Sequence, residues 1–117
     1  MCLIIFAHQV NETFPLVVAA NRDEFHARPT DPAQFWPEHP GLLAGRDLQA
    51  GGTWMGIHRN GRFAAITNFR DPAQTRPAPR SRGELPTRFL LGEPGPEAYL
   101  AELEPSAGDY AGFNLLL

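Results

Sequence analysis

Residues 53–67 read TWMGIHRNGRFAAIT, with an apolar run on each side of the dipeptide Asn60-Gly61. Each run has the length and the branched or aromatic side chains that are typical of a β-strand. Asn-Gly favours a two-residue type I′ turn, in which both central residues take positive φ. The sequence therefore predicts a β-hairpin here, with Thr53 opposite Asn68.

A second antiparallel hairpin is predicted at the start of the chain. Residues 3–10 and 16–20 are apolar runs, and the Asn-Glu-Thr of residues 11–13 supplies the turn between them. Pairing about that turn brings Cys2 opposite residues 20–23. Consecutive apolar positions in both runs are typical of a sheet that is covered on both faces.

Between and after these hairpins, short elements alternate with loops. The proline-rich segments 29–40 and 71–82 are predicted to be irregular. Ser81 and Glu84 have the spacing of a capping box, so a helix is expected over residues 85–91.

The end of the chain adds a helix and a strand. The helix is expected over residues 96–103, with Tyr99, Leu100 and Leu103 on one face, and the strand over residues 110–117. Antiparallel strands with flanking short helices predict an α+β fold. Two short helices cannot cover both faces of the sheet, so residues 1–117 are either part of a longer domain or bury one face against a partner.

Composition excludes several functional classes. The chain has 117 residues, of which 43% are hydrophobic and 20% charged, as expected for one globular domain. The net charge of −3 argues against general nucleic-acid binding. No apolar run is long enough for a membrane span, and the N-terminus lacks the features of a signal peptide. A cytoplasmic protein is expected, with homo-oligomerisation left open.

Metal and disulfide chemistry are not indicated either. The single cysteine excludes an internal disulfide, and the four histidines have no zinc-ligand spacing, so no metal site is predicted.

Cys2 is the first candidate for catalysis. Removal of Met1 would leave a cysteine whose free α-amine, with a pKa of about 8, can act as a base beside its own thiol. The alternative is a small buried thiol at the start of a core strand. The hairpin register places Arg22 and Asp23 beside it, where the carboxylate can orient the amine and the guanidinium can activate the thiol or bind an anion. The alternative for the run Asn21-Arg22-Asp23-Glu24 is a solvated strand end with a local salt bridge.

Asn68 is the second candidate, because it ends an apolar strand as Asn21 does. Its amide can donate to an oxyanion during acyl transfer, or it can bond the local backbone. Gly51 and Gly52 either allow a substrate close to the backbone or are ordinary loop glycines. An arginine-rich segment can bind phosphate or form a solvated loop, and it contains Arg76, Arg80, Arg82 and Arg88.

Several short motifs, in order along the chain, resemble those of the NRDE family, the transport and Golgi organisation proteins. The match covers nearly the whole chain, although the members of that family are longer. The motifs are Met1-Cys2-Leu3-Ile4, Asn21-Arg22-Asp23-Glu24-Phe25, Arg28-Pro29-Thr30, Phe35-Trp36, Gly45-Arg46-Asp47, Gly51-Gly52-Thr53-Trp54, Thr67-Asn68-Phe69-Arg70, Ser81-Arg82-Gly83 and Gly112-Phe113-Asn114-Leu115.

The NRDE family is similar to the N-terminal nucleophile (Ntn) hydrolases, in which two antiparallel sheets lie between helical layers. The resemblance implies that residues 1–117 are a single partial domain, the N-terminal portion of an αββα Ntn-hydrolase-like fold. It is strongest to the penicillin acylase and bile-salt hydrolase branch, where the arginine and aspartate are separated rather than adjacent. The resemblance implies catalytic roles for Cys2, Arg22, Asp23 and Asn68, and binding roles for Asn21, Glu24, Trp54 and Arg70.

Two functions follow from the resemblance. The first is hydrolysis of a non-peptide amide bond by an N-terminal cysteine, with a small-molecule substrate and no cofactor assigned. The second is a non-catalytic module that binds and carries haem or an acyl-CoA or other lipid, with Trp36, Trp54 and Phe69 near the cleft. Fold resemblance alone does not decide between them.

Overall fold

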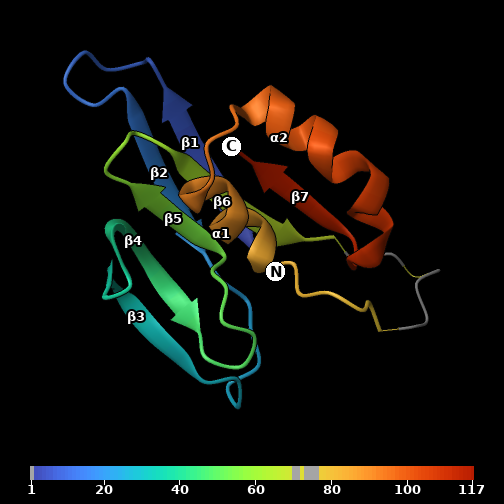
Figure 1. The fold of residues 1–117 in the computed structure, drawn as a ribbon. Helices are drawn as coiled ribbons and strands as arrows, with labels where there is room; N and C mark the ends of the chain where they lie inside the picture. Colours follow the sequence, from blue (N-terminus) through green and yellow to red (C-terminus); the bar gives the residue numbers. More distant parts are fainter. Residues whose placement is uncertain (1, 70–71, 73–76) are drawn as a thin grey trace.

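The computed structural model describes residues 2–69, 72 and 77–117 and has the predicted α+β fold (Figure 1). Its larger sheet is antiparallel, with five strands in the order β3-β4-β5-β6-β7. These strands are β3 (Thr30–Trp36), β4 (His39–Asp47), β5 (Met55–His58), β6 (Phe63–Asn68) and β7 (Phe113–Leu116). The smaller sheet pairs β1 (Leu3–His8) with β2 (Leu16–Asn21). The helices are α1 (Glu84–Leu91), α2 (Pro96–Leu103) and the 3-10 helix η1 (Glu104–Asp109).

The predicted central hairpin is confirmed as β5–β6, but its turn differs. Gly61 has a φ of +89°, whereas Asn60 is not among the described non-glycine residues with positive φ. The His58 N–H donates to the Arg62 carbonyl oxygen at 2.8 Å, which closes a three-residue loop rather than a type I′ turn. Such a loop needs the left-handed conformation at one residue only.

The extra loop residue shifts the register of this hairpin by one position. Met55 pairs with Ala65, and the Ile66 N–H donates to the Trp54 carbonyl at 2.8 Å. The predicted pairing of Thr53 with Asn68 is therefore wrong. Asn68 instead pairs with a residue of β7.

The first hairpin, β1–β2, is confirmed with Leu3 opposite Asn21. It lies behind β5 and β6 in Figure 1. An Asx turn closes it, because the Asn11 side-chain oxygen accepts bonds from two backbone N–H groups farther along the loop. The apolar side chains of this hairpin are only partly covered within the chain, since Ile5 is 61% exposed and Phe6 is 52% exposed.

The prediction that residues 29–40 are irregular is wrong, because they contain β3 and the start of β4. Proline is tolerated there for two reasons. First, β3 is the edge strand of its sheet. Second, Pro32 falls between Asp31 and Gln34, where the pairing with β4 changes register, so its missing N–H interrupts no regular ladder.

Helix α1 lies across β5 and β6 and builds the core with them (Figure 1). Leu85, Phe89 and Leu90 on α1 are buried against Leu42 and Ala64 of the sheet. The predicted position of α1 is confirmed, but the capping box is wrong.

The N-cap residue of α1 is Gly83, and no side chain caps the helix. The carboxylate of Glu84 instead accepts a hydrogen bond from the Tyr110 hydroxyl and pairs with Arg80.

Helix α2 has the predicted bounds. Tyr99 and Leu103 are buried, and the Tyr99 hydroxyl donates to the Leu85 carbonyl at 2.8 Å. Leu100, which was predicted to share their face, is 46% exposed. No helix in the described parts of the chain has the length and apolar character needed to cross a bilayer.

Candidate functional site

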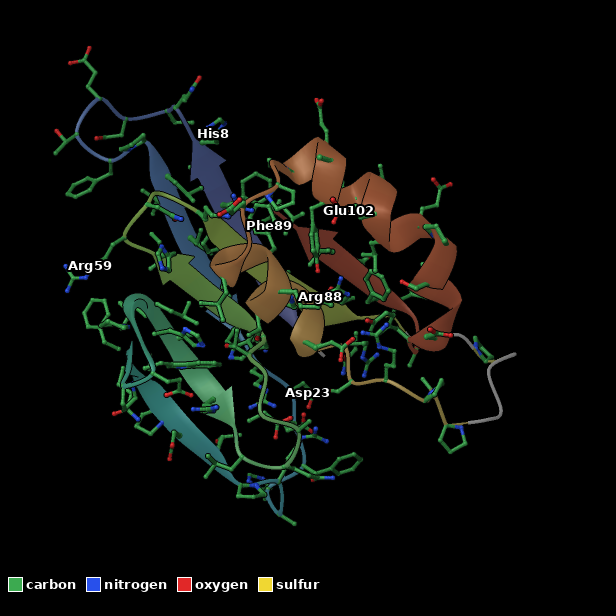
Figure 2. The ribbon with its side chains drawn as sticks, in the orientation of Figure 1. His8, Asp23, Arg59, Arg88, Phe89 and Glu102 are labelled. Carbon is green, nitrogen blue, oxygen red and sulfur yellow. The ribbon has the colours of Figure 1, made fainter. Side chains whose placement is uncertain are left out.

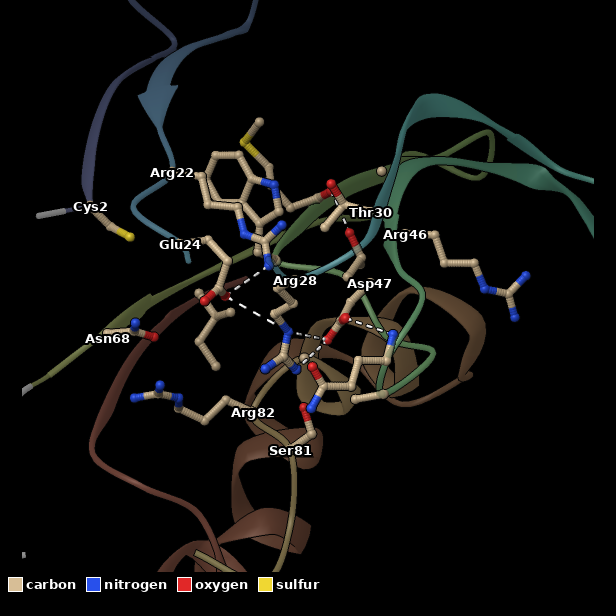
Figure 3. A pocket seen from close by; sticks show the side chains of 18 of the residues that line it. Cys2, Arg22, Glu24, Arg28, Thr30, Arg46, Asp47, Asn68, Ser81 and Arg82 are labelled. Carbon is tan, nitrogen blue, oxygen red and sulfur yellow. Dashed lines mark hydrogen bonds and ion pairs between the residues drawn. The ribbon is translucent and has the colours of Figure 1, made fainter. Parts of the chain in front are cut away.

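An open pocket of about 750 Å³ lies between the ends of β1 and β2, the end of β4, and the segment that precedes α1 (Figure 3). Most of the site residues expected from the sequence line it. They are Cys2, Arg22, Asp23, Glu24, Trp54 and Asn68.

The thiol of Cys2 is held at one wall of this pocket by the neighbouring strand. The Asp23 backbone N–H donates to the Cys2 sulfur at 3.3 Å, and the sulfur lies 3.9 Å from the Asp23 carbonyl oxygen. The predicted proximity of Cys2 to the end of β2 is therefore confirmed. Cys2 is partly buried, and Figure 3 shows its sulfur turned toward the pocket.

Charged side chains form a continuous row along the pocket wall. The Arg22 guanidinium pairs with the Glu24 carboxylate at 3.0 Å, and the same carboxylate oxygen lies 3.9 Å from Arg28. Arg28 in turn pairs with Asp47 at 2.6 Å. The local salt bridge that was one reading of the strand end is present, as the pair of Arg22 with Glu24.

Asp47 is nearly buried, with 8% of its surface exposed, and it organises the turn after β4. Its carboxylate accepts two bonds from Arg28 and one from the Gln49 N–H, and its carbonyl accepts from the Gly51 N–H. Burial alone would raise the pKa of Asp47, but the bonds from Arg28 and Gln49 together lower it below its ordinary value.

Sequence reasoning assigned no role to Arg28 or Asp47, which are 19 residues apart. The available signal was Asp47 followed by Gly51-Gly52, a combination that indicates a tight turn. Gly51 has a φ of +78°, which fits its reading as a loop glycine. Gly52 serves a close approach between backbones, because a Cβ added there would lie 2.4 Å from the Gly83 carbonyl oxygen.

Arg82 enters the pocket from the segment before α1. One of its terminal nitrogens, Nη1, donates to the Gly112 carbonyl oxygen at 2.8 Å. Burial lowers the pKa of Arg82, and the charges of Glu24 and Cys2 act on it in the opposite direction. Arg82 and Cys2 line the same pocket.

The other expected residues are distributed as follows. Asn68 ends β6 and is exposed at the pocket, whereas Trp54 is partly buried and packs on the core. Asn21 pairs with Leu3 and is not among the described residues that line the pocket. Arg70 lies outside the described residues.

The polar groups of the pocket suit nucleophilic and anion-binding chemistry. They include a thiol, two side-chain amides, hydroxyl groups, guanidinium groups and carboxylates. Across the part of the chain that the structure describes, no group of three or more His, Cys, Asp or Glu side chains is placed to hold a metal ion.

Comparison with known proteins places the chain in a family. The family profile described as Transport and Golgi organisation 2 matches residues 1–117. The "Transport and Golgi organization 2 homolog" of Mus musculus is 38% identical over 123 residues, which cover 99% of this chain and 44% of the mouse protein. The "Transport and Golgi organization protein 2 homolog" of Homo sapiens is 39% identical with the same coverage.

The similarity extends to insects. The "Transport and Golgi organization protein 2" of Drosophila melanogaster is 37% identical over 72 residues, which cover 56% of this chain and 25% of the fly protein. The chain spans less than half the length of these curated relatives. Because the profile match covers the full chain and the mammalian proteins match nearly all of it, the chain belongs to the Transport and Golgi organisation 2 family.

Proposed function

We propose that the pocket is the site of an amidohydrolase that uses Cys2 as an N-terminal nucleophile on a non-peptide amide bond. The observation that carries the proposal is the position of the Cys2 sulfur, which accepts the Asp23 N–H at the wall of a pocket that Asn68 also lines. The pocket volume of about 750 Å³ suits a small molecule. Further support is the resemblance to the Ntn hydrolases, in which a strand begins with the nucleophile.

The proposed reaction begins after removal of Met1, which frees the α-amine of Cys2. The thiol attacks the carbonyl carbon of the amide, and its proton passes to this amine. The side-chain amide of Asn68 donates to the oxyanion of the tetrahedral intermediate. The carbon–nitrogen bond then breaks, and the leaving amine takes the proton from the α-ammonium group.

A thioester on Cys2 remains after the amine leaves. Water attacks this thioester with the α-amine as base, which releases a carboxylic acid and restores the thiol. In this scheme the Asp23 carboxylate orients the α-ammonium group, and Arg22 acts through Glu24 to hold the strand end in place.

Two measurements test this mechanism directly. Intact-mass analysis should show that Met1 is absent from the mature protein, and a panel of acyl amides should include a substrate that the wild type hydrolyses. Cys2→Ala should abolish that turnover. An active protein that retains Met1, or an active Cys2→Ala variant, would overturn the mechanism.

The role of Asn68 has its own matched pair of variants. Asn68→Asp removes the amide donor with little change in volume, and kcat should fall by about 10²–10³-fold. Asn60→Asp makes the same change at the tip of the β5–β6 hairpin, where the side chain only accepts a bond from the Arg62 N–H. Asn60→Asp should leave kcat unchanged.

A non-catalytic binding module is the second candidate function. The favouring observation is the arginine-rich lining of the pocket together with Trp54, which suits a ligand with both anionic and apolar parts. Titration with haem and with an acyl-CoA should then give saturable binding that Cys2→Ala does not change, without amide turnover. The names of the relatives associate them with transport and Golgi organization, and the proposal extends that process to this chain.

A further inference from the structure

We propose that Arg82 is the anion-binding residue of the pocket, and that the ligand carries a carboxylate or phosphate group held by this guanidinium beside Cys2. The inference rests on the proposed use of the pocket and names the chemical class that the pocket accepts. Anion binding does not itself require amide hydrolysis, so the two ideas can fail separately.

The first argument is the balance of charge at the pocket. Four of the arginines that line it are each paired with a carboxylate. These pairs are Arg22 with Glu24, Arg28 with Asp47, Arg46 with Glu38, and Arg80 with Glu84. Arg82 differs, because no carboxylate of residues 2–69, 72 and 77–117 forms an ion pair with it. Its charge is therefore the one in the described lining that a bound anion would neutralise.

The second argument is that the guanidinium is held in place with donors to spare. Nη1 is bound to the Gly112 carbonyl oxygen at 2.8 Å, which fixes the plane of the group. A guanidinium has five N–H donors, so Nη2 and Nε can still present two roughly parallel bonds to an oxyanion. A positioned guanidinium loses less rotamer entropy on binding than a freely rotating one.

The third argument is partial burial. Arg82 is only partly exposed, and burial lowers its pKa, so water solvates the charge less well than on an open surface. An anion at such a position interacts more strongly than it would with an exposed arginine. The nearby Glu24 carboxylate is already shared between Arg22 and Arg28 and does not pair with Arg82.

The fourth argument places the anion relative to the reacting atom. Figure 3 shows the Arg82 side chain extending toward Asn68, on the side of the pocket where Cys2 lies. Arg82, Asn68 and Cys2 all line this pocket. A carboxylate or phosphate on Arg82 would therefore lie close to the carbonyl that Cys2 attacks, and a ligand with a cation at that place would be disfavoured.

The experiment measures binding of inorganic phosphate and, separately, of acetate to the 117-residue chain by amide chemical-shift titration. Arg82→Gln removes the charge, and Arg82→Lys keeps it without the planar pair of donors. Arg59→Gln is the matched control, because Arg59 is an exposed residue at the tip of the β5–β6 hairpin that stacks on Phe35 and does not line the pocket (Figure 2).

The expected result is saturable binding by the wild type, with shifts confined to the pocket, and at least about tenfold weaker binding by Arg82→Gln, equivalent to about 1.4 kcal/mol. Arg82→Lys should bind with intermediate affinity, and Arg59→Gln should match the wild type. Tighter phosphate binding would assign a phosphate-bearing ligand, and tighter acetate binding a carboxylate.

Wild-type affinity in Arg82→Gln, or no saturable binding of either anion, would overturn the proposal. If Arg82→Gln does not fold, Arg82→Lys decides, because unchanged affinity in that variant would equally contradict paired guanidinium donors. Arg82-dependent binding without amide turnover would refute the hydrolase and leave the anion site intact.

Discussion

Replacing Asp47 by asparagine tests the charged row that lines the pocket. The substitution preserves shape but removes the negative charge that faces Arg28 at 2.6 Å. Breaking a fully buried ion pair costs about 3–5 kcal/mol, and breaking an exposed pair costs at most about 1 kcal/mol. This pair lies between those limits, because the Asp47 and Arg28 side chains are 9% and 26% exposed.

Arg28 also keeps a weaker contact with Glu24, at 3.9 Å, after the substitution. We therefore expect a loss of about 2 kcal/mol in the free energy of unfolding, and a fall in Tm of about 8 °C for a chain of this size. Glu38→Gln is the matched control, because it makes the same chemical change in an exposed pair with Arg46. The control should be close to the wild type.

The dependence of this effect on pH follows from the bonds that Arg28 and Gln49 make to the Asp47 carboxylate, which lower its pKa. A group whose pKa is lower in the folded state stabilises the protein above its unfolded pKa, and this stabilisation is lost as the pH falls through the folded pKa. The difference between wild type and Asp47→Asn should be constant above about pH 5 and shrink below about pH 4.

Urea unfolding from pH 3 to pH 7 measures the difference at each pH. A wild-type midpoint in Asp47→Asn at pH 7 would refute the reasoning. So would an equal loss in Glu38→Gln, or a difference that does not diminish in acid.

Three further variants test packing and hydrogen bonding. Gly52→Ala should lower the free energy of unfolding, measured in urea, by about 3 kcal/mol, because its Cβ would lie 2.4 Å from the Gly83 carbonyl oxygen. In the control Gly108→Ala the new Cβ meets nothing within 4 Å, so equal effects of the two substitutions would contradict this account. Arg62→Met should lower stability by about 2 kcal/mol, since it removes three bonds to carbonyl oxygens at and beyond the end of α1, and an unchanged unfolding curve would refute that role. Burial and then a bond to a neighbouring carboxylate raise the pKa of Tyr110 to about 12, so stability should be lost as the pH rises from about 10 toward 12. The difference between the absorbance titration curves of the wild type and of Tyr110→Phe should have its midpoint near pH 12. A midpoint near pH 10 would be inconsistent with the burial of Tyr110 and with its bond to the carboxylate.

Much of the fold could be predicted because its signals are local. The apolar runs around Asn60-Gly61 and the segment of residues 96–103 each carry their own pattern, and they form β5–β6 and α2. The pair β3–β4 was missed because Pro32 is compatible with a strand only at a sheet edge. That position is set by tertiary structure. The turn type was missed because Asn-Gly also suits a three-residue loop in which only glycine is left-handed.

The candidate site divides in the same way. The proximity of Cys2 to Asp23 was predicted by counting residues outward from the turn of the first hairpin, and the structure confirms it. The pairing of Arg28 with Asp47 joins segments 19 residues apart and depends on where two turns meet in space. No periodicity in the sequence encodes such a contact. The sequence placed Arg82 in a family motif and in an arginine-rich segment, but it did not show that Arg82 differs from the other arginines in its ion-pair partners, because the fold brings those partners together.

The two-stranded β1–β2 sheet has a consequence for the dynamics of Cys2. An isolated pair of strands with exposed apolar side chains has little to resist local opening, so its amide protons should exchange with solvent sooner than those of β4–β6. Cys2 is held by this hairpin through the Asp23 N–H. The rate at which an alkylating reagent modifies the chain's single thiol should therefore report how often the hairpin opens, and any ligand that spans the pocket to the five-stranded sheet should slow both processes together.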